Sequence, residues 1–376
     1  MPSSLILLDS GVRRNDECDV MLDALSWATH GKGEYVKIAI GFHIQDGPWG
    51  GGNQFARSLA EALESRGDQV RFDLLDKDID LIVLADPRAR SSNVSFGAGA
   101  ILRYLLFHNP LALVIHRINE CDERKGSRHM NRLLRQANYC ADHTVFIASW
   151  LRDLNLWRRK SSASVILNGG DPAIFNSHGF RAWDGKEPFK LVTHHWGGNL
   201  MKGFDIYRLL DDLIGEPEWR DRIRFTYIGN LPKGFAFKNV SYLPPMNGAA
   251  LAQELRTHHG YVTGSMNEPA GMHHIEGALC GLPLLYRQSG ALPEYCSGFG
   301  IEFSDPGSFL NALNQFMDDY GRLVARMPNY PHTSSRMCHG YLALFDELMA
   351  NREEILSRRR HLLRNPWLWL RNQVPY

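Results

Sequence analysis

Two runs of alternating strand and helix patterns constrain the fold of this chain more than any other feature. In each run, short apolar segments alternate with longer segments whose apolar residues recur every three to four positions, as on one face of a helix. Parallel strands need a crossover connection, and a helix usually supplies it, so this alternation is typical of parallel sheets covered by helices. The sequence therefore predicts two α/β units, one after the other.

The first run starts near residue 35 and the second near residue 189. In the first run we expect strands at 36–42, 70–75, 81–85, 113–116, 144–147 and 164–167, and helices at 54–66, 97–107 and 130–141. In the second run we expect strands at 189–193, 223–228, 240–243, 261–263 and 284–286, and helices at 204–214 and 249–255. The polar segment 176–188 fits a linker, whereas residues 1–34 follow neither pattern.

At 376 residues the chain exceeds one typical domain, and 44% hydrophobic residues are enough for two cores. We expect an N-terminal Rossmann-like domain over 1–185 and a C-terminal Rossmann-like domain over 186–354. A C-terminal helix at about 355–376 is expected to join the first domain. The fold class is thus α/β, with two doubly wound domains that face a central cleft, where ligands of such sheets bind.

Charge and cysteine usage narrow the class of protein. Forty-two basic and 41 acidic residues leave a net charge of +1, which argues against nucleic acid as the main partner. The six cysteines lack paired or metal-like spacing and are typical of reduced thiols in a cytosolic protein. The start has no basic region of the signal-peptide kind, and no stretch approaches the roughly 18 apolar residues of a membrane span. We expect a soluble, cytoplasmic protein.

Glu268 and Glu276 bracket a Pro-Ala-Gly turn that opens a short helix, which Gly281 ends. A loop that leads into a helix N-terminus exposes backbone N–H groups and a positive dipole end, which suits a phosphate. A carboxylate before that terminus and another about one turn inside the helix can accept hydrogen bonds from hydroxyls. Together these groups describe a pocket for a sugar nucleotide. From this stretch alone, a capped surface helix with two solvated acids fits equally well.

A glycine-rich loop at 47–53 lies between an expected strand and an expected helix. Glycines such as Gly51 and Gly52 let a backbone approach a ligand closely, and the helix offers its N-terminus to an anion. The loop lacks the lysine of a phosphate-binding P-loop and the glycine spacing of a dinucleotide fingerprint. A flexible loop is the alternative.

His116 closes an apolar run at 111–115. A histidine at the carboxyl end of a strand in an α/β sheet points into the cleft, where it can bind substrate or assist proton transfer. The alternative is a structural histidine, which is the more common case. The charged segment 120–126 that follows is a candidate mobile loop over the same cleft.

Lys202 lies in a second connection of strand, glycine loop and helix, at 193–204. Its ammonium group can neutralise a diphosphate, with His195 or Asn199 as further donors. The alternative is a solvated lysine at a helix start, where the helix dipole makes a cation mildly unfavourable. That local conflict favours a functional role.

Neither a metal site nor a serine hydrolase is predicted. The adjacent histidines at 194–195, 258–259 and 273–274 do not face one point on a helix or strand, and no His-x3-His or Cys-x2-Cys motif occurs at a plausible spacing. The Gly-x-Ser-x-Gly motif of many serine hydrolases is also missing.

Arginines cluster beside two tryptophans at 357–371. Such a segment can rest on an anionic membrane surface, so peripheral membrane contact is one expectation. The favoured alternative is a helix that packs its apolar face on the first domain and leaves the arginines in water.

Over roughly 35–350, these motifs resemble glycosyltransferase family 4, the retaining enzymes of the GT-B fold that use sugar nucleotides. The shared motifs are, in order, the glycine loop 50–52, His116, the segment 165–175, Lys202 with Gly203, the pair Glu268 and Glu276, and the turn 290–294.

The resemblance implies a role for each group of the second unit. Glu268 would accept hydrogen bonds from the hydroxyls of the donor sugar, with N–H groups near Gly271 and Met272 around the sugar and diphosphate. Glu276 would bind the ribose, and Lys202 the diphosphate.

The resemblance also implies that His116, with Glu268, lies by the reacting sugar as a catalytic residue, while Gly51 and Gly52 close the phosphate side. Such enzymes need no metal or other cofactor, because lysine, helix dipole and backbone donors stabilise the departing diphosphate. The family usually carries an arginine five residues before the diphosphate lysine, and here that position is Gly197. Either His195 or Asn199 compensates, or diphosphate binding is weakened.

The sequence therefore predicts a retaining glycosyltransferase that moves a hexose from a nucleotide-diphosphate sugar to a hydroxyl of a glycan or lipid-linked acceptor. One alternative is a sugar-nucleotide epimerase on the same scaffold. The other is a binder of nucleotide sugars without catalytic activity.

Overall fold

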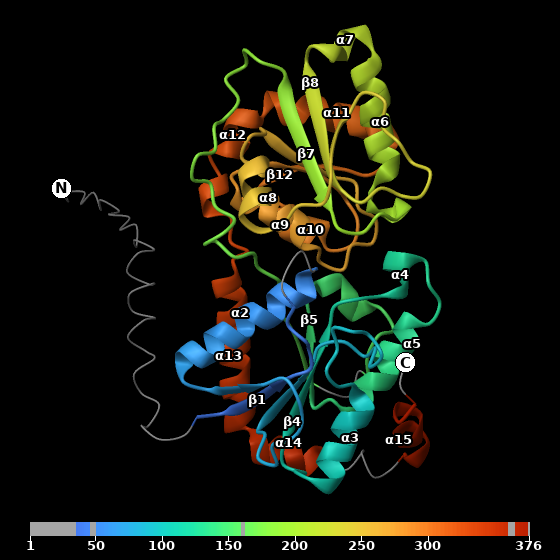
Figure 1. Ribbon diagram of the computed structural model, residues 1–376, viewed down its shortest axis with the longest axis vertical. Helices are drawn as coiled ribbons and strands as arrows, with labels where there is room; N and C mark the ends of the chain where they lie inside the picture. The colour runs from blue at the N-terminus through green and yellow to red at the C-terminus, as the bar shows by residue number, and fades with distance from the viewer. Residues whose placement is uncertain (1–34, 46–49, 159–161, 360–364, 375–376) are drawn as a thin grey trace, which may run out of the picture. The chain divides into compact units, whose positions relative to one another are not determined.

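The computed structural model describes residues 35–45, 50–158, 162–359 and 365–374 (Figure 1). Within it, Val36–Tyr376 forms one compact unit. Three segments discussed above lie outside the described residues: 1–34 with Cys18, the part of the glycine loop at 46–49, and residues 360–364 of the basic tail.

The first sheet contains six parallel strands in the order β2-β1-β3-β4-β5-β6. They are β1 (Lys37–Ile40), β2 (Gln69–Arg71), β3 (Leu81–Leu84), β4 (Leu113–Ile118), β5 (His143–Phe146) and β6 (Ser162–Val165). The helices between them are α2 (Gly51–Arg66), α3 (Ala98–Phe107), α4 (Asp122–Lys125) and α5 (Met130–Ala137). Each predicted strand overlaps an observed one, but the bounds differ: β2 ends four residues before its expected end, and β4 continues two residues beyond its own.

The second sheet is also parallel, in the order β12-β11-β10-β7-β8-β9. Its strands are β7 (Phe189–His195), β8 (Ile223–Gly229), β9 (Ser241–Leu243), β10 (Gly260–Thr263), β11 (Leu284–Arg287) and β12 (Gly300–Phe303). Strand β12 was not predicted. It is an edge strand that buries only Ile301 and Phe303, so its apolar signal is short.

Helices alternate with the strands of the second sheet, as the sequence predicted. They are α6 (Phe204–Gly215), α7 (Pro217–Arg220), α8 (Gly248–Leu255), α9 (Met272–Leu279), α10 (Leu292–Cys296), α11 (Pro306–Asp318) and α12 (Tyr320–Val324). Helices α13 (Ser334–Ala350), α14 (Arg352–Arg358) and α15 (Pro366–Asn372) follow. The α/β class with two Rossmann-like halves is therefore confirmed.

Alternate residues of the central strands enter different cores, as the two-residue period of a strand requires. In β3, Leu81 and Val83 belong to one hydrophobic cluster, whereas Ile82 and Leu84 belong to another. All four side chains are completely buried. Burial on both faces explains why this strand appears in the sequence as a continuous apolar run.

Helix α13 returns from the second sheet to cover the first. It packs beside α2 (Figure 1), and the rings of Phe55 and Tyr341 lie 5.1 Å apart. Met337 and Phe345 join the same cluster as the strands of the first sheet. The C-terminal segment expected to join the first domain was 355–376. Helix α13 ends before residue 355 and also packs on the first sheet. The domain limits at 185 and 354 stay a prediction.

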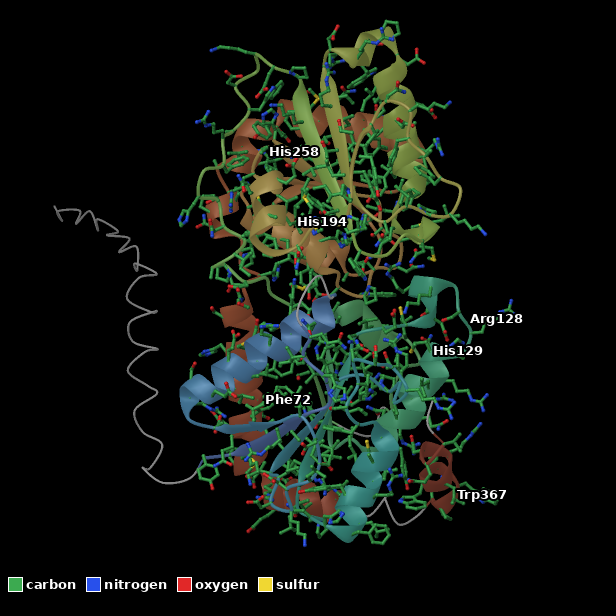
Figure 2. The ribbon with its side chains drawn as sticks, in the orientation of Figure 1. Phe72, Arg128, His129, His194, His258 and Trp367 are labelled. Atoms are coloured by element: carbon green, nitrogen blue, oxygen red, sulfur yellow. The ribbon has the colours of Figure 1, made fainter. Side chains whose placement is uncertain are left out.

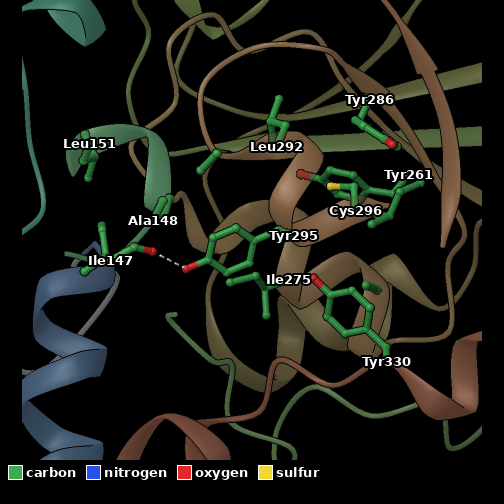
Figure 3. Packing of buried hydrophobic residues seen from close by; sticks show 14 of the residues in the cluster. Ile147, Ala148, Leu151, Tyr261, Ile275, Tyr286, Leu292, Tyr295, Cys296 and Tyr330 are labelled. Carbon is green, nitrogen blue, oxygen red and sulfur yellow. Dashed lines mark hydrogen bonds between the residues drawn. The ribbon is translucent and has the colours of Figure 1, made fainter. Parts of the chain in front are cut away.

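A third cluster contains residues from the ends of both sheets (Figure 3). The hydroxyl of Tyr295, on α10, donates a 2.7 Å hydrogen bond to the carbonyl of Ile147, just after β5. The same hydroxyl accepts a hydrogen bond from the backbone N–H of Asn168 at 2.6 Å. This buried tyrosine therefore ties α10 to the first sheet.

No helix in the described ranges is long and apolar enough to cross a membrane. Five cysteines of the same ranges are buried free thiols, namely Cys121, Cys140, Cys280, Cys296 and Cys338. The cytoplasmic location stays a prediction.

Candidate functional site

A cavity of about 370 Å³ lies where loops of both sheets meet. The first half of the chain contributes Gly51, Gln54 and Arg124 to its lining, among others. The second half contributes, among others, Lys202, Glu268, Glu276 and the N-terminal turn of α9. The structure thus brings together most of the site residues that the sequence predicted.

The loop between β10 and α9 has a backbone shape that presents Glu268 to the cavity. Asn267 adopts a left-handed backbone with φ of 50°, which asparagine tolerates better than most residues. A Cβ atom at Gly290 would lie 2.5 Å from the backbone N and O of Glu268, so only glycine allows the 290–294 turn to approach. The N–H of Ala291 then donates to the carbonyl of Glu268 at 2.8 Å.

Two cations hold the carboxylate of Glu268, whose side chain is 5% exposed. The Nζ atom of Lys202 lies 3.1 Å from Oε2, and the Nε atom of Arg124 lies 3.5 Å from Oε1. Burial alone would raise the pKa of Glu268, but Lys202 and Arg124 outweigh it and lower this pKa to about 2. Glu268 is therefore a firmly ionised hydrogen-bond acceptor rather than a general acid.

Lys202 reaches the cavity because two loops approach each other closely. Gly203 has a φ of 100°, and a Cβ atom there would lie 2.5 Å from the backbone of Gly264, which follows β10. Burial lowers the pKa of Lys202, Glu268 raises it, and the neighbouring Arg124 lowers it further, with a net decrease. A desolvated ammonium group of this kind is suited to an anionic ligand.

Glu276 lies in the first turns of α9 and is 4% exposed as a residue. Its Oε1 accepts a 2.9 Å hydrogen bond from Nε2 of Gln54, on α2. Its Oε2 lies 2.7 Å from Nε2 of His194, at the carboxyl end of β7 (Figure 2). One carboxylate thus receives donors from both halves of the chain.

The N-termini of helices α9 and α2 both face the cavity. Gly271 caps α9 and lines the cavity with Met272, while Gly51 begins α2. A Cβ atom at Gly51 would lie 2.7 Å from Cγ of Met272, so the two termini are close neighbours. The first N–H groups of each helix lack partners within it and form, with the helix dipole, a favourable environment for an anion.

The sequence has no match among protein-family models or among curated proteins. Three solved structures are similar to it along their whole length. Sucrose-phosphate synthase from Thermosynechococcus elongatus has 15% identity and a TM-score of 0.58, and the match covers 84% of this chain and 100% of that one. HepE of Anabaena, in complex with UDP-glucose, has 13% identity and a TM-score of 0.61, with 84% and 100% covered.

The third is the catalytic domain of starch synthase IV from Arabidopsis thaliana, bound to ADP and acarbose. It has 13% identity and a TM-score of 0.60, and the match covers 87% of this chain and 100% of that one. All three are glycosyltransferases of the GT-B fold. The chain has the GT-B fold. The expected fold class, α/β with two Rossmann-like halves in the GT-B arrangement, is thereby confirmed.

Of three other residues predicted for the donor site, two line the cavity and one does not. His195 lines the cavity, but its Nε2 lies 2.6 Å from the hydroxyl of Tyr207, and burial holds its pKa well below the usual range. Asn199 lies exposed at the cavity edge. Gly52 does not line the cavity, and a Cβ atom there would lie 3.1 Å from the ring of Phe42.

His116 does not lie where the sequence placed it. Strand β4 continues to Ile118, so His116 is inside the strand rather than at its carboxyl end, and its side chain is completely buried. The amide nitrogen of Asn138 lies 3.1 Å from its Nδ1, and burial lowers its pKa to about 3. His116 is a neutral side chain that does not line the cavity.

Arg124 and Gln54 are cavity residues that sequence reasoning missed. Arg124 belongs to the charged segment 120–126, which was expected to be a mobile loop and instead contains the helical turn α4. An arginine is a residue type that binds anions, but no motif or spacing in the sequence distinguished Arg124 from the charged residues beside it. Gln54 follows the glycine loop by two residues and carried no signal of its own.

Within the described ranges, no group of three or more histidine, cysteine, aspartate or glutamate side chains could hold a metal ion. Burial lowers the pKa of His273 well below the usual range and that of His274 to about 3. Both histidines are therefore neutral near neutral pH; Nε2 of His273 lies 3.0 Å from the hydroxyl of Thr263, whereas neither ring nitrogen of His274 has a hydrogen-bond partner among the described residues.

Proposed function

We propose that this protein is a retaining glycosyltransferase that moves a hexose from a nucleotide-diphosphate sugar to a hydroxyl of a glycan or lipid-linked acceptor. The observation that carries the proposal is the arrangement of Lys202, Glu268 and Glu276 around the N-terminus of α9 in one cavity of a GT-B fold. HepE was solved with UDP-glucose and starch synthase IV with ADP, so donors of this class bind to proteins of similar fold.

The donor would be recognised in three parts. Glu268 accepts hydrogen bonds from the hydroxyls of the hexose, and Glu276 accepts them from the ribose. Lys202 and the N–H groups at Gly271 and Met272 bind the diphosphate, with the N-terminus of α2 at Gly51 on the opposite side. Ionised carboxylates suit the hydroxyl contacts because they act only as acceptors.

In the proposed reaction, the acceptor oxygen bonds to the anomeric carbon while the bond from that carbon to the β-phosphate oxygen breaks. The acceptor proton passes to the departing diphosphate. Attack from the face that the diphosphate leaves retains the configuration. Lys202 and the helix N-terminus stabilise the charge that develops on the leaving group, so no metal or other cofactor is required. His116 has no step in this scheme, and its catalytic role stays a prediction.

A donor panel tests the proposal. The protein is incubated with UDP-, GDP- and ADP-hexoses and a mixture of glycan and lipid-linked acceptors, and release of nucleoside diphosphate is measured. We expect turnover of at least one donor, with retained anomeric configuration by NMR. No binding or turnover of any donor would falsify the proposal.

The same panel separates the two alternatives. With donor alone, an epimerase would give an altered sugar that is still attached to the nucleotide. A binder without catalytic activity would show nucleotide binding in calorimetry and an unchanged donor after long incubation. Each result would replace the transferase proposal.

We also propose that α15 brings the protein to an anionic membrane surface. Trp367 and Leu370 of this helix, and Val374 just beyond its end, are 78%, 52% and 63% exposed. Helix α5 lies beside α15 and bears the exposed Arg132 and Arg135, while the exposed Arg128 lies between α4 and α5; Figure 2 labels Arg128 and Trp367. The inner face of α15, with Leu368 and Trp369, packs on the first-sheet core.

Sedimentation with lipid vesicles tests this contact. We expect the protein to bind vesicles that contain phosphatidylserine and not vesicles of phosphatidylcholine alone. Trp367→Ser with Leu370→Ser should release it, whereas substitution of the exposed Tyr242 on β9 should not. Equal binding of all variants would overturn the proposal.

A further inference from the structure

Arg124 is a buried cation to which the proposed donor site assigns no role. It belongs to α4, lines the cavity and is only 6% exposed. Its Nε atom lies 3.5 Å from Glu268, a long ion pair. Its Nη1 atom is buried without a hydrogen-bond partner among the described residues. Arginine is rarely buried with an unused N–H group, because the lost hydration is costly.

Helix α4 holds Arg124 in place through Asp122. The carboxylate of Asp122 accepts backbone hydrogen bonds from Met130 at 2.8 Å and Asn131 at 3.0 Å, which begin α5. The side chain of Ser127 donates to the same carboxylate. Arg124 is therefore presented to the cavity by a short element that is fixed at both ends, not by an open loop.

The charges around the cavity do not balance at this point. Lys202 and Arg124 face the single carboxylate of Glu268. The other two acids of the cavity lining are engaged elsewhere. Glu276 receives Gln54 and His194, and Glu120 pairs with Lys125 at 2.7 Å. Two buried cations therefore share one anion, and an anionic ligand would restore the balance.

We propose that Arg124 is the second cation of the donor site, which binds the β-phosphate of the nucleotide-diphosphate sugar, and that Glu268 occupies the position of that phosphate until the donor binds. This inference rests on the proposed function. The β-phosphate is the one next to the sugar, and Arg124 contacts the carboxylate that we assign to the sugar. A guanidinium group binds two phosphate oxygens at once, which uses the Nη1 that now lacks a partner.

When the donor binds, the two cations would exchange one anionic partner, the carboxylate of Glu268, for another, the diphosphate. Lys202 and Arg124 turn from Glu268 to the diphosphate, and the freed carboxylate accepts hydrogen bonds from the sugar hydroxyls. Arg124 follows β4, so the first half of the chain would help to bind the leaving group. The resemblance found in the sequence implies an arginine at the position of Gly197, and Arg124 would supply the same charge from the first half of the chain.

Calorimetry with nucleotides tests the role of Arg124. UDP, GDP and ADP are titrated into the full-length protein, followed by the monophosphate of whichever base binds. We expect Arg124→Ala to weaken diphosphate binding by about 10- to 100-fold and monophosphate binding by less than about threefold. Arg124→Lys keeps the positive charge and should lose less diphosphate affinity than Arg124→Ala does. Arg128 is an exposed arginine between α4 and α5, and the Arg128→Ala variant is the matched control, which should bind as the wild type does.

A rescue variant provides a sharper criterion. A Cβ atom at Gly197 would have Cε of Lys202 at 3.7 Å and Nδ2 of Asn199 at 4.0 Å as its nearest neighbours, which are ordinary contact distances. Gly197 also lines the cavity, so an arginine there has room to reach the diphosphate. We expect Gly197→Arg to restore at least about tenfold of the diphosphate affinity lost in Arg124→Ala. Gly197→Gln, which has no charge, should restore none.

Replacing Glu268 should have the opposite effect on diphosphate binding. Glu268→Gln removes the anion that competes for the two cations, so the affinity for the diphosphate should rise by about threefold or more. If it falls, Glu268 does not occupy the phosphate position.

The outcomes distinguish this inference from the proposed function. A wild-type protein that binds no nucleoside diphosphate contradicts both. A wild-type protein that binds one, with an Arg124→Ala variant that binds it equally well, contradicts only the role of Arg124. Equal losses for mono- and diphosphate would also overturn it, because they would indicate a general change in the cavity. Circular dichroism and thermal unfolding of each variant identify any that fail to fold.

Discussion

The two sides of the cavity present their functional groups in different ways. On the side of the second sheet, Lys202 and Glu268 lie in connections that follow directly from β7 and β10, and Glu276 lies in the helix that the second connection opens. On the side of the first sheet, Gln54 lies inside α2 and Arg124 lies on α4, the first helix after β4. Lys202 and Glu268 thus lie ahead of the α-helix of their connections, whereas Gln54 and Arg124 lie within α-helices.

This difference determines what each side can do. Glycines at 203 and 264 bring the loops of the second sheet into contact, so the backbones that carry Lys202 and Glu268 are held close together while the side chains stay free to change partners. From the side of the first sheet, Gln54 contacts the carboxylate of Glu276, and Arg124 contacts the carboxylate of Glu268. In the proposed site, the second side would position the nucleotide sugar, and the first side would add hydrogen-bond donors to it. The following predictions test this division.

The largest effect is expected at Glu268. Glu268→Gln keeps the size of the side chain but removes the charged acceptor for the sugar hydroxyls, so turnover should fall by roughly 100-fold or more. Steady-state assays of nucleoside diphosphate release measure this loss. Glu302→Gln, an exposed acid on the edge strand β12, is the matched control and should keep wild-type turnover. A Glu268 variant with normal turnover would mean that this side does not bind the transferred sugar.

The sequence revealed the second side more fully than the first for a physical reason. Short glycine turns that follow apolar strands fix where the next side chain points, and both features are local. Lys202, Glu268 and Glu276 could therefore be predicted. Arg124 could not, because α4 has no apolar periodicity and its position depends on the contacts of Asp122 with α5. The strands were predictable from apolar runs except β12, which buries only two side chains.

His116 illustrates the limit of the same argument. Its apolar run was correctly assigned to a strand, but the run continues through Arg117 and Ile118, both buried. Arg117 is polar and would ordinarily end such a run. It is accommodated because its guanidinium group lies 3.9 Å from the centre of the Phe55 ring and donates to Asn168 at 2.8 Å. Such tertiary partners cannot be read from the local sequence.

The pH dependence of diphosphate binding tests whether the ammonium group of Lys202 provides the positive charge that binds the diphosphate. Burial lowers the pKa of this lysine in the free protein, so its charge is present below that pKa and is lost at a lower pH than for an ordinary lysine. Diphosphate affinity should decrease as pH rises through this range, by up to about tenfold per pH unit. Calorimetry between neutral and alkaline pH measures the decrease. In Lys202→Arg the charge persists, and the decrease should move to higher pH.

Glu276 should affect the nucleoside and not the sugar. Glu276→Gln loses the charged acceptor for the ribose hydroxyls and weakens the contacts with Gln54 and His194, so nucleotide affinity should fall by about five- to tenfold. The control is a nucleotide without ribose hydroxyls. The wild type should bind it more weakly than the ribonucleotide, and the variant should lose little further affinity. A loss of equal size with both ligands would place the ribose elsewhere.

The smallest effect is expected at His116, where sequence and geometry differ most. The variant His116→Leu removes a buried ring whose Nε2 has no partner among the described residues, and Nδ2 of Asn138 keeps its 2.9 Å hydrogen bond to Thr144. Stability should therefore change by less than about 1 kcal/mol, and turnover by less than about threefold. Urea unfolding and the donor assay measure the two quantities. A loss of turnover near 100-fold in a stably folded variant would restore the catalytic role that the sequence suggested, and would place a reacting group on the first side of the cavity.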